Sequence, residues 1–591
     1  MAAVRCLLPG GRLLAVGASL AVAVAVAIAA PRPSLAIGLP PAPAEEPLPA
    51  AQRQLRLADE HLRASCEMLR NCDRHAMDGY YVACQEAWNA VQICPGSPPL
   101  LREAADLYAD ALAGFLEAAR RHGRIGRGGV WVGPPGRLVC VPLAPKALPV
   151  AAEAIASLEP QGQFDDKRIA RRQLRDGFGL PVVVRVKSAT GTAVERRFAA
   201  DRQSLAATAV LRFDMPGGEN SLEKFAGPAY RDHAAAVLDL ANPVEIAAVK
   251  LGPARPHLAA DLTAPLLDVL GGTPKTGIRG FIQPFGGSDT QPRLEFLEPH
   301  QPGRIPVVFI HGLGSDEGTW FDMLNELRAW PEFHRRFEPW LMHYPTGASF
   351  LAVSATLRLQ LQAAVAGLDP QGRDPALRRV VLVGHSMGGL HAKMMAVDSG
   401  SEIWYSIAQV PFEQIRVRPQ TRELMQRATF FRPQPFVSRV IFIATPHKGS
   451  ILASLGVGRL ASLAVSEPPE ITAVHDEAVG KNPGAFRSEY AQKVPTTIDL
   501  LEPTSPTLQA LDRLRPACWV ATHSILGDVH PSLFGGRDDC VVSVESGHTP
   551  GARSEICVPA KHTKVHHHPQ AILEVKRILS EHLAEFDSTP R

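Results

Sequence analysis

The sequence predicts an α/β fold for residues 301–591, in which a mostly parallel sheet is covered by helices on both faces. Four apolar, β-branched runs alternate there with segments of helical periodicity: "RIPVVFIHG", "RRVVLVGHS", "VSRVIFIATPHKGS" and "ACWVATHSILGD". Strands that are apolar on both faces are typical of buried parallel sheets. Each run ends in glycine or polar residues, and chemistry in such sheets gathers at the carboxyl ends of the strands.

Length and charge limit the number of domains and the kinds of partner that the chain can have. A chain of 591 residues is too long for one compact core, so we expect several domains. Charged residues make up 20% of the chain and the formal net charge is only +3. No basic block indicates a nucleic-acid partner, and we expect none.

Residues 1–36 have the pattern of a signal peptide. Arg5 and Arg12 precede a long apolar run, and Ser34 and Ala36 are small residues at the spacing that a signal peptidase reads. We therefore expect export to a secreted or periplasmic location in the cell envelope. The apolar run exceeds the usual signal core of about 7–15 residues, so an uncleaved membrane anchor is the alternative.

The chain between the signal and the α/β region falls into three parts. Residues 37–52 are rich in proline and alanine and are expected to form a linker. Residues 53–125 have helical periodicity, which favours a helical bundle over a tetratricopeptide-like helix pair. Residues 126–300 contain short β-prone runs between glycine, proline and aspartate clusters, which predicts a mixed, largely β domain.

Cysteine usage permits disulfides. An even number of cysteines would remain after signal cleavage, and an exported chain can pair them, although buried free thiols are the alternative. No close Cys-x-x-Cys pair indicates zinc, and we expect no metal. The eight residues are Cys66, Cys72, Cys84, Cys94, Cys140, Cys518, Cys540 and Cys557.

The segment around Ser386 carries the strongest chemical signal. Gly384 to Gly388 read Gly-His-Ser-Met-Gly, preceded by the predicted strand 380–383 and followed by the predicted helix 390–397. This strand–turn–helix setting holds a serine on a sharp turn, with its hydroxyl exposed above a sheet. The alternative is an ordinary serine in a tight turn.

A serine hydroxyl needs a base to become a good nucleophile, and in this setting an acid and then a base follow it in the chain. The C-terminal part supplies both, in "GGRDDCVVSVESGH" and "VPAKHTKVHHHPQAILEVKRIL". Ile572, Val575 and Leu579 mark a closing helix with one buried face. A histidine in the loop before that helix can reach the strand ends.

Five segments occur in the order found in one known family: "FIHGLG", "GHSMGG", "TPHKGS", "DDCVVSVES" and "KHTKVH". Residues 301–591 therefore resemble the α/β-hydrolases of the lipase and esterase type, including bacterial lipases and inositol deacylases. The resemblance covers about half of the chain and implies nothing for residues 37–300.

The resemblance implies that Asp539 is the acid, because "DDCVVSVES" is similar to the lipases' Asp-Gly-hydrophobic-Val stretch. Cys540 stands where the family has glycine. Asp538 is the rival acid, and Asp528 is a weaker one.

His562 is the expected base, because it precedes the closing helix by a short loop, as the family's histidine does. His566, His567 and His568 are the alternatives. The backbone N–H groups of Met387 and Leu313 are the expected oxyanion-hole donors, since one follows the serine and the other lies in "HGLG".

These roles imply a Ser-His-Asp triad that hydrolyses a carboxylic ester through an acyl-enzyme, without metal or organic cofactor. An acyltransferase with the same triad and a catalytically retired envelope scaffold protein are the alternatives. The expected partner is a small-molecule or lipid ester, with peripheral contact to membrane or envelope.

Two long segments interrupt the predicted strands, at about 400–436 and 451–512. Their apolar stretches "IWYSIAQVPF" and "ILASLGVGRLASLAV" suit a cap over a lipid-binding site. Ordinary helices packed on the sheet are the alternative, so lipase and small-ester esterase both stay open.

Overall fold

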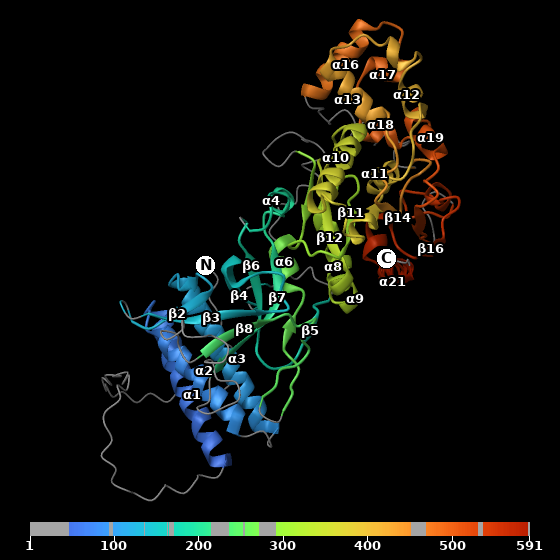
Figure 1. The fold of residues 1–591 in the computed structure, drawn as a ribbon. Coiled ribbons are helices and arrows are strands. Elements are labelled where there is room, and N and C mark those ends of the chain that lie inside the picture. Colours follow the sequence, from blue (N-terminus) through green and yellow to red (C-terminus); the bar gives the residue numbers. More distant parts are fainter. Residues whose placement is uncertain are drawn as a thin grey trace, which may run out of the picture. The chain divides into compact units, whose positions relative to one another are not determined.

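A computed structural model gives the fold (Figure 1). It describes residues 47–588 with gaps at 94–97, 135, 137, 162–163, 165–170, 189, 214–235, 252–253, 271–290, 451–468 and 530–535. The predicted signal peptide at 1–36 lies outside the described residues, as do residues 37–46 of the predicted linker.

The described chain opens with three helices: α1 (Pro47–Arg70), α2 (Ala76–Ile93) and α3 (Pro98–Arg121). Residues 47–52 are therefore helical, and the prediction of a linker was wrong for them. Proline is tolerated in a first helical turn because the N–H that it lacks has no intrahelical acceptor there. A proline-rich stretch can for this reason start a helix.

A mixed sheet follows the helices, in the order β1-β2-β3-β8-β7-β6-β4. Its neighbours are antiparallel except β3 and β8, which are parallel. The strands are β1 (Ile125–Gly126), β2 (Gly129–Val132), β3 (Val139–Lys146), β4 (Ile155–Pro160), β6 (Leu180–Val186), β7 (Ser204–Phe213) and β8 (Ala236–Ala241). Shorter elements of this region are β5 (Leu174–Arg175), β9 (Ala260–Asp261), α4 (Ala193–Phe198) and α6 (Ala264–Leu270).

The three helices and this sheet share one apolar core. Tyr108 of α3 stacks on Phe178 at 5.0 Å between ring centroids and donates its hydroxyl to the carbonyl oxygen of Leu211 at 2.8 Å. A hydroxyl buried on folding needs such an acceptor, so this bond stabilises the helix–sheet contact.

The second sheet has the order β10-β12-β11-β13-β14-β15-β16 and is parallel except for β10. Its strands are β10 (Arg293–Phe296), β11 (Ile305–Ile310), β12 (Phe337–His343), β13 (Val380–His385), β14 (Val437–Ile443), β15 (Ala521–Gly527) and β16 (Ser554–Val558). The predicted fold class, an α/β arrangement after a helical segment and a largely β region, is confirmed.

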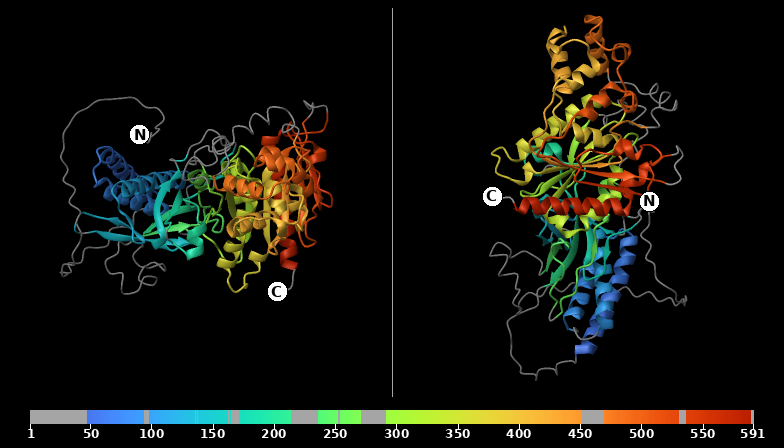
Figure 2. Two further views of the ribbon diagram at one scale, coloured as in Figure 1. Left: turned by 90° about the horizontal axis from the view of Figure 1, so that it is seen from above. Right: turned by 90° about the vertical axis from the view of Figure 1, so that its right-hand side faces the viewer.

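Helices lie on both faces of this second sheet (Figure 2). Val308 and Ile310 of β11 face the core that contains α10 (Phe350–Leu368) and α11 (Met387–Met394). Val307 and Phe309 face the opposite core, which contains α8 (Phe321–Arg328), α9 (Pro331–Arg336) and α21 (Pro569–Ser588). Side chains alternate along a strand, which explains why the run at 305–310 is apolar throughout.

The sheet begins earlier than the predicted boundary at residue 301. β10 pairs antiparallel with β12, with Arg293 opposite His343 and Phe296 opposite Trp340. The backbone N–H of Ala200 donates to the carbonyl oxygen of Phe296 at 3.1 Å. A four-residue antiparallel strand breaks the strand–helix alternation on which the boundary was based.

The two predicted insertions contain α12 (Glu402–Ile407), α13 (Pro419–Thr429), α16 (Pro469–Lys481), α17 (Ser488–Gln492), α18 (Thr497–Leu501) and α19 (Pro506–Arg513). Side chains around Trp404 form a separate apolar cluster with Met425 and Phe486, which joins the two insertions. We call the four helices of this cluster, α12, α13, α16 and α17, the cap. Leu500 and Leu508 instead belong to the core beside α10 and α11, so α18 and α19 pack as ordinary covering helices.

Two further observations bear on the predictions. Cys72, Cys84, Cys140, Cys518, Cys540 and Cys557 are not joined in disulfides.

Among the described helices, α10 is long and apolar enough by length and composition to cross a membrane. The core helix of a globular domain meets the same criteria, and eight residues of α10 are buried.

Candidate active site

Ser386 lies on the sharp turn between β13 and α11. Its backbone has φ 55° and ψ −126°, a conformation that few residues other than glycine adopt. The serine N–H donates to the carbonyl oxygen of Ile443 on the neighbouring strand at 2.8 Å. The turn therefore holds the side chain at the carboxyl end of the central strands.

The two glycines of the motif permit this turn. A Cβ on Gly384 would lie 2.5 Å from the Cα of Gly389, and a Cβ on Gly388 would lie 2.1 Å from the carbonyl oxygen of Ile310. Both distances are far below van der Waals contact with backbone atoms that cannot move aside. Glycine is required because α11 starts directly against β11 and β13.

His562 begins the short helical turn η7 (His562–His567) before α21. Its Nε2 is 2.8 Å from Oγ of Ser386, and its Nδ1 is 2.7 Å from Oδ2 of Asp539. The backbone N–H of His562 also donates to the carbonyl oxygen of Asp539 at 2.9 Å. Three residues that are distant in sequence are thus joined by hydrogen bonds in one line.

Asp539 is buried and held by its own loop. Its Oδ1 accepts hydrogen bonds from the N–H groups of Val541 at 2.9 Å and Val542 at 2.7 Å, which leaves Oδ2 for His562. Between these residues, Cys540 has φ 74°, in the left-handed region that favours glycine.

The loop after β11 lies against the serine. A Cβ on Gly312 would be 2.9 Å from Cβ of Ser386, so Gly312 lies against the serine. Leu313 is the next residue of this loop. The N–H of Gly314 donates to Oγ1 of Thr346 at 3.1 Å, and the hydroxyl of Tyr344 donates to the carbonyl oxygen of His311 at 2.5 Å. The loop after β12 therefore supports the loop after β11.

Met387, the other predicted oxyanion donor, is the first residue of α11. The first N–H groups of a helix have no acceptor within the helix. Met387 and the loop that contains Leu313 thus both lie next to Ser386.

The sequence comparison agrees with this arrangement. Residues 307–575 match the sequence model of the alpha/beta hydrolase family. This region is an α/β-hydrolase domain. The predicted resemblance is confirmed, and membership of this family supports hydrolase activity.

Solved structures similar to this chain include the mature lipase BlEst2 of Bacillus licheniformis, with 17% identity over 50% of this chain and 99% of that chain and a TM-score of 0.28. Esterase B from Lactobacillus rhamnosis has 15% identity over 52% and 85% of the two chains, with a TM-score of 0.27. The esterase Est2 of Thermogutta terrifontis has 15% identity over 50% and 91%, with a TM-score of 0.26. None of the curated proteins compared with the chain matches it.

The alternative acids of the hydrolase domain have other contacts. Oδ1 of Asp538 accepts the N–H of Cys540 at 2.8 Å. Asp528 forms an ion pair with Arg537 at 2.6 Å. Neither contact is with His562, whereas Asp539 bonds it directly.

His566, the alternative base, is bonded through Nε2 to Oγ1 of Thr319 at 2.7 Å. Burial and the neighbouring His385 lower the pKa of His566 well below its ordinary value. A histidine held neutral beside Thr319 has a packing role in the hydrolase domain.

His385 has a contact that its sequence position does not indicate. Its Nε2 is 3.1 Å from the carbonyl oxygen of His562, and its ring centroid is 5.1 Å from that of His562. Burial, followed by repulsion from His562, lowers the pKa of His385 well below 6.5. The neutral ring can donate only through Nε2 here, since a carbonyl oxygen accepts.

His447 of "TPHKGS" lies at the end of β14. Its Nε2 is 3.1 Å from Oγ1 of Thr549, and its ring packs edge-on against Phe442 at 4.7 Å. The sequence signal for such supporting residues is weak, because their partners lie about a hundred residues away. In the described part of the chain, no group of three or more His, Cys, Asp or Glu residues is arranged to hold a metal ion.

Proposed function

We propose that the hydrolase domain cleaves carboxylic esters with Ser386 as nucleophile, His562 as base and Asp539 as acid. One observation carries the proposal: the line of hydrogen bonds from Oγ of Ser386 through the imidazole to Oδ2 of Asp539, with lengths of 2.8 and 2.7 Å. Both distances lie in the range that nucleophilic catalysis requires.

In the first step, Ser386 Oγ attacks the ester carbonyl carbon while His562 Nε2 takes the hydroxyl proton. Asp539 stabilises the imidazolium and keeps Nδ1 protonated. The N–H groups of Met387 and Leu313 stabilise the negative oxygen of the tetrahedral intermediate. His562 then returns the proton to the leaving alcohol, and Ser386 carries the acyl group.

In the second step, His562 removes a proton from water, which attacks the acyl carbon. The carbon–oxygen bond to Ser386 breaks, the carboxylic acid leaves, and the serine regains its proton from His562. The residues of this chain supply every proton transfer in the cycle.

The experiment is hydrolysis of para-nitrophenyl esters by wild type and by Ser386→Ala. We expect the variant to lose nearly all turnover and to resist labelling by a fluorophosphonate probe. Ser438→Ala, on the neighbouring strand β14, should retain both. Equal turnover of the Ser386 variant and wild type would remove the proposed nucleophile.

The same assay separates the alternative functions. Ester transfer to an added alcohol in preference to water would identify an acyltransferase. A folded wild-type protein that is not labelled would indicate a retired scaffold.

Export of the protein belongs to this proposal. The basic residues Arg5 and Arg12, the apolar run and the small residues Ser34 and Ala36 support it. N-terminal sequencing of the protein from the cell envelope or medium is the test: a mature chain that starts after Ala36 is expected, and an intact Met1 would favour the anchor.

A further inference from the structure

The loop after β12 bonds the loop after β11 at two points that flank Leu313, the proposed oxyanion donor. Before Leu313, the carbonyl oxygen of His311 accepts the hydroxyl of Tyr344 at 2.5 Å. After Leu313, the N–H of Gly314 donates to Oγ1 of Thr346 at 3.1 Å. The N–H of Leu313 therefore lies between two backbone groups that are fixed by one neighbouring loop.

The bond from Tyr344 is protected from water. Tyr344, Thr346 and His311 are all buried. Burial raises the pKa of Tyr344 well above its ordinary value, so the hydroxyl keeps its proton and remains a donor throughout the neutral pH range. Loss of this hydroxyl would leave the buried carbonyl oxygen of His311 without its partner, which is unfavourable. The bond therefore restrains the start of the loop.

A row of four rings packs beside these bonds. Tyr344 stacks on His311 at 4.3 Å between ring centroids, and on its other side it meets His391 of α11 at 5.0 Å and a steep angle of 79°. His391 in turn stacks on Phe350 of α10 at 4.4 Å, and its Nδ1 is 2.7 Å from Oγ of Ser354. The ring of Tyr344 thus has packed neighbours from two further elements, which fixes the direction of its hydroxyl.

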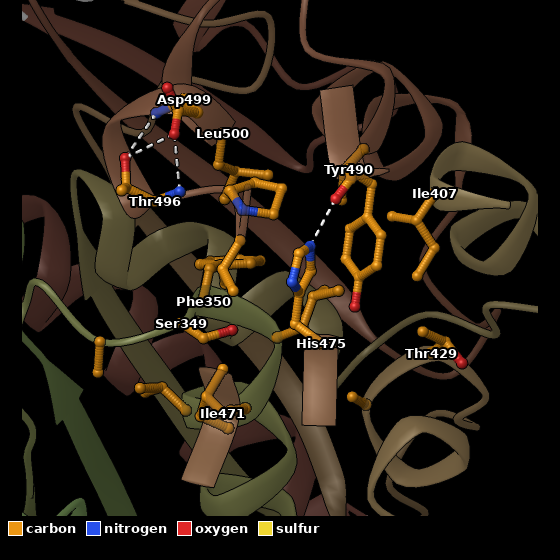
Figure 3. A pocket seen from close by; sticks show the side chains of 18 of the residues that line it. Ser349, Phe350, Ile407, Thr429, Ile471, His475, Tyr490, Thr496, Asp499 and Leu500 are labelled. Carbon is orange, nitrogen blue, oxygen red and sulfur yellow. Dashed lines mark hydrogen bonds between the residues drawn. The ribbon is translucent and has the colours of Figure 1, made fainter. Parts of the chain in front are cut away.

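The far end of the loop after β12 has its own anchor, beside a cavity. Ala348, Ser349 and Phe350 line a cavity of about 1070 Å³ between α10 and the cap (Figure 3). Oγ1 of Thr497 in α18 donates to the carbonyl oxygen of Ala348 at 2.9 Å. No residue of the proposed triad lines this cavity, so it is separate from the reacting centre. The loop after β12 is therefore held by α18 independently of the loop that it bonds.

We propose that Tyr344 and Thr346 are positioning residues, which hold the N–H of Leu313 where the negative oxygen of the tetrahedral intermediate forms. The proposal rests on the proposed function. An oxyanion donor is effective when it already lies about 2.7–3.1 Å from the place of the developing charge. This charge is present in the transition state and not in the bound ester. Loss of position therefore lowers kcat and leaves KM nearly unchanged.

The first test is hydrolysis of para-nitrophenyl acetate by Tyr344→Phe, which keeps the ring and removes the hydroxyl. We expect kcat to fall by about 10- to 100-fold, since outright removal of an oxyanion donor costs about 10²–10³. KM should stay near the wild-type value. Tyr108→Phe is the matched control, because Tyr108 is also buried and donates to a backbone carbonyl oxygen, that of Leu211, at 2.8 Å. It should keep the wild-type kcat.

A pair of variants at Thr346 tests the second bond. Thr346→Val removes the acceptor at nearly the same shape and should lower kcat by about tenfold, a smaller loss than removal of a donor. Thr346→Ser keeps the hydroxyl and should restore most of the wild-type kcat. Equal kcat in the Val and Ser variants would overturn the role of Thr346. If Tyr344→Phe does not fold, this pair decides the proposal.

Trifluoroacetone, a transition-state analogue, separates positioning from a general disturbance of the fold. Oγ of Ser386 adds to its carbonyl carbon while His562 takes the hydroxyl proton, which leaves a negative oxygen in the oxyanion site. The inhibition constant should rise in Tyr344→Phe by roughly the factor by which kcat/KM falls, and should not change in Tyr108→Phe. An unchanged kcat in Tyr344→Phe, or a lower kcat with an unchanged inhibition constant, would overturn the proposal.

Failure of this proposal differs from failure of the proposed function. If Ser386→Ala loses turnover while Tyr344→Phe and Thr346→Val keep the wild-type kcat, the nucleophile stands and the two residues have no part in positioning. If folded wild type cleaves no ester and is not labelled by a fluorophosphonate probe, the proposed function and this proposal both fail.

Discussion

His385 donates from Nε2 to the carbonyl oxygen of His562, over 3.1 Å. The residue next to the proposed nucleophile therefore bonds the backbone of the proposed base. Its Nδ1 is buried and has no hydrogen-bond partner within the described structure, so the bond from Nε2 is the one hydrogen bond described for the ring. We therefore expect His385 to position the proposed base.

Replacing His385 by phenylalanine removes the donor and keeps a ring of similar shape. We expect kcat to fall by about 10- to 100-fold, because a small displacement of a catalytic group costs about this much. His385→Gln can donate from its amide and should recover part of the loss. Steady-state kinetics check both, and equal kcat for the Phe and Gln variants would contradict a positioning role.

Asp539→Asn should lower kcat by about 10³- to 10⁴-fold with little change in stability. The amide group can meet Nδ1 of His562 as a donor, which favours the wrong tautomer. Asp538→Asn and Asp528→Asn are the matched controls and should retain kcat within about tenfold, because neither carboxylate bonds the imidazole in its described contacts. A larger loss in Asp538→Asn than in Asp539→Asn would reverse the assignment of the acid.

Cys540→Gly should raise the free energy of unfolding by about 0.5 to 1 kcal/mol. The left-handed conformation at φ 74° costs a residue with a Cβ about 1–2 kcal/mol, and part of the gain is lost to the greater freedom of glycine in the unfolded chain. Urea unfolding measures the difference. Cys557→Gly in β16 is the control and should destabilise, since glycine weakens a strand.

Stability should fall in mild acid because two histidines are buried beside an arginine. Arg439 of β14 is fully buried and lies 2.6 Å from Nε2 of His523 and 3.2 Å from Nδ1 of His582. Burial and the guanidinium lower the pKa of each histidine from 6.5 to about 4. Between these pH values the unfolded chain binds more protons than the folded one, so stability decreases as the pH falls.

This effect is at most about 1.4 kcal/mol per pH unit for each histidine. Urea unfolding at pH 7, 6 and 5 measures it, and we expect most of the loss below about pH 6.5. The double variant His523→Gln/His582→Gln should show a shallower dependence on pH. The same slope in wild type and the double variant would show that other groups cause it.

Most of the correct predictions came from short sequence segments. The turn around Ser386 was predicted because its glycines and its flanking strand and helix lie within about twenty consecutive residues. The resemblance to lipases then indicated Asp539 and His562, and the structure joins Asp539 to His562 and His562 to the serine by hydrogen bonds. Cys540 adopts a conformation suited to glycine, in agreement with the family pattern.

Contacts between segments that are distant in the chain could not be predicted from the sequence. β10 is short and runs antiparallel, so its pairing with β12 gave no periodic signal. The support of the Leu313 loop by Tyr344 and Thr346 depends on two strands meeting at one end of the sheet. The division of the second insertion between the cap and the main core depends on which apolar surfaces remain free after the sheet forms.

The early start of the second sheet bears on how the enzyme can be dissected. A catalytic fragment that starts at residue 301 would lack Arg293–Phe296. One edge of β12 would then have unpaired backbone N–H and C=O groups. An exposed edge strand can pair with strands of other molecules, which leads to aggregation. A soluble catalytic fragment therefore has to retain Arg293–Phe296. The hydrogen bond from the N–H of Ala200 to Phe296 also connects this edge strand to the preceding region of the chain.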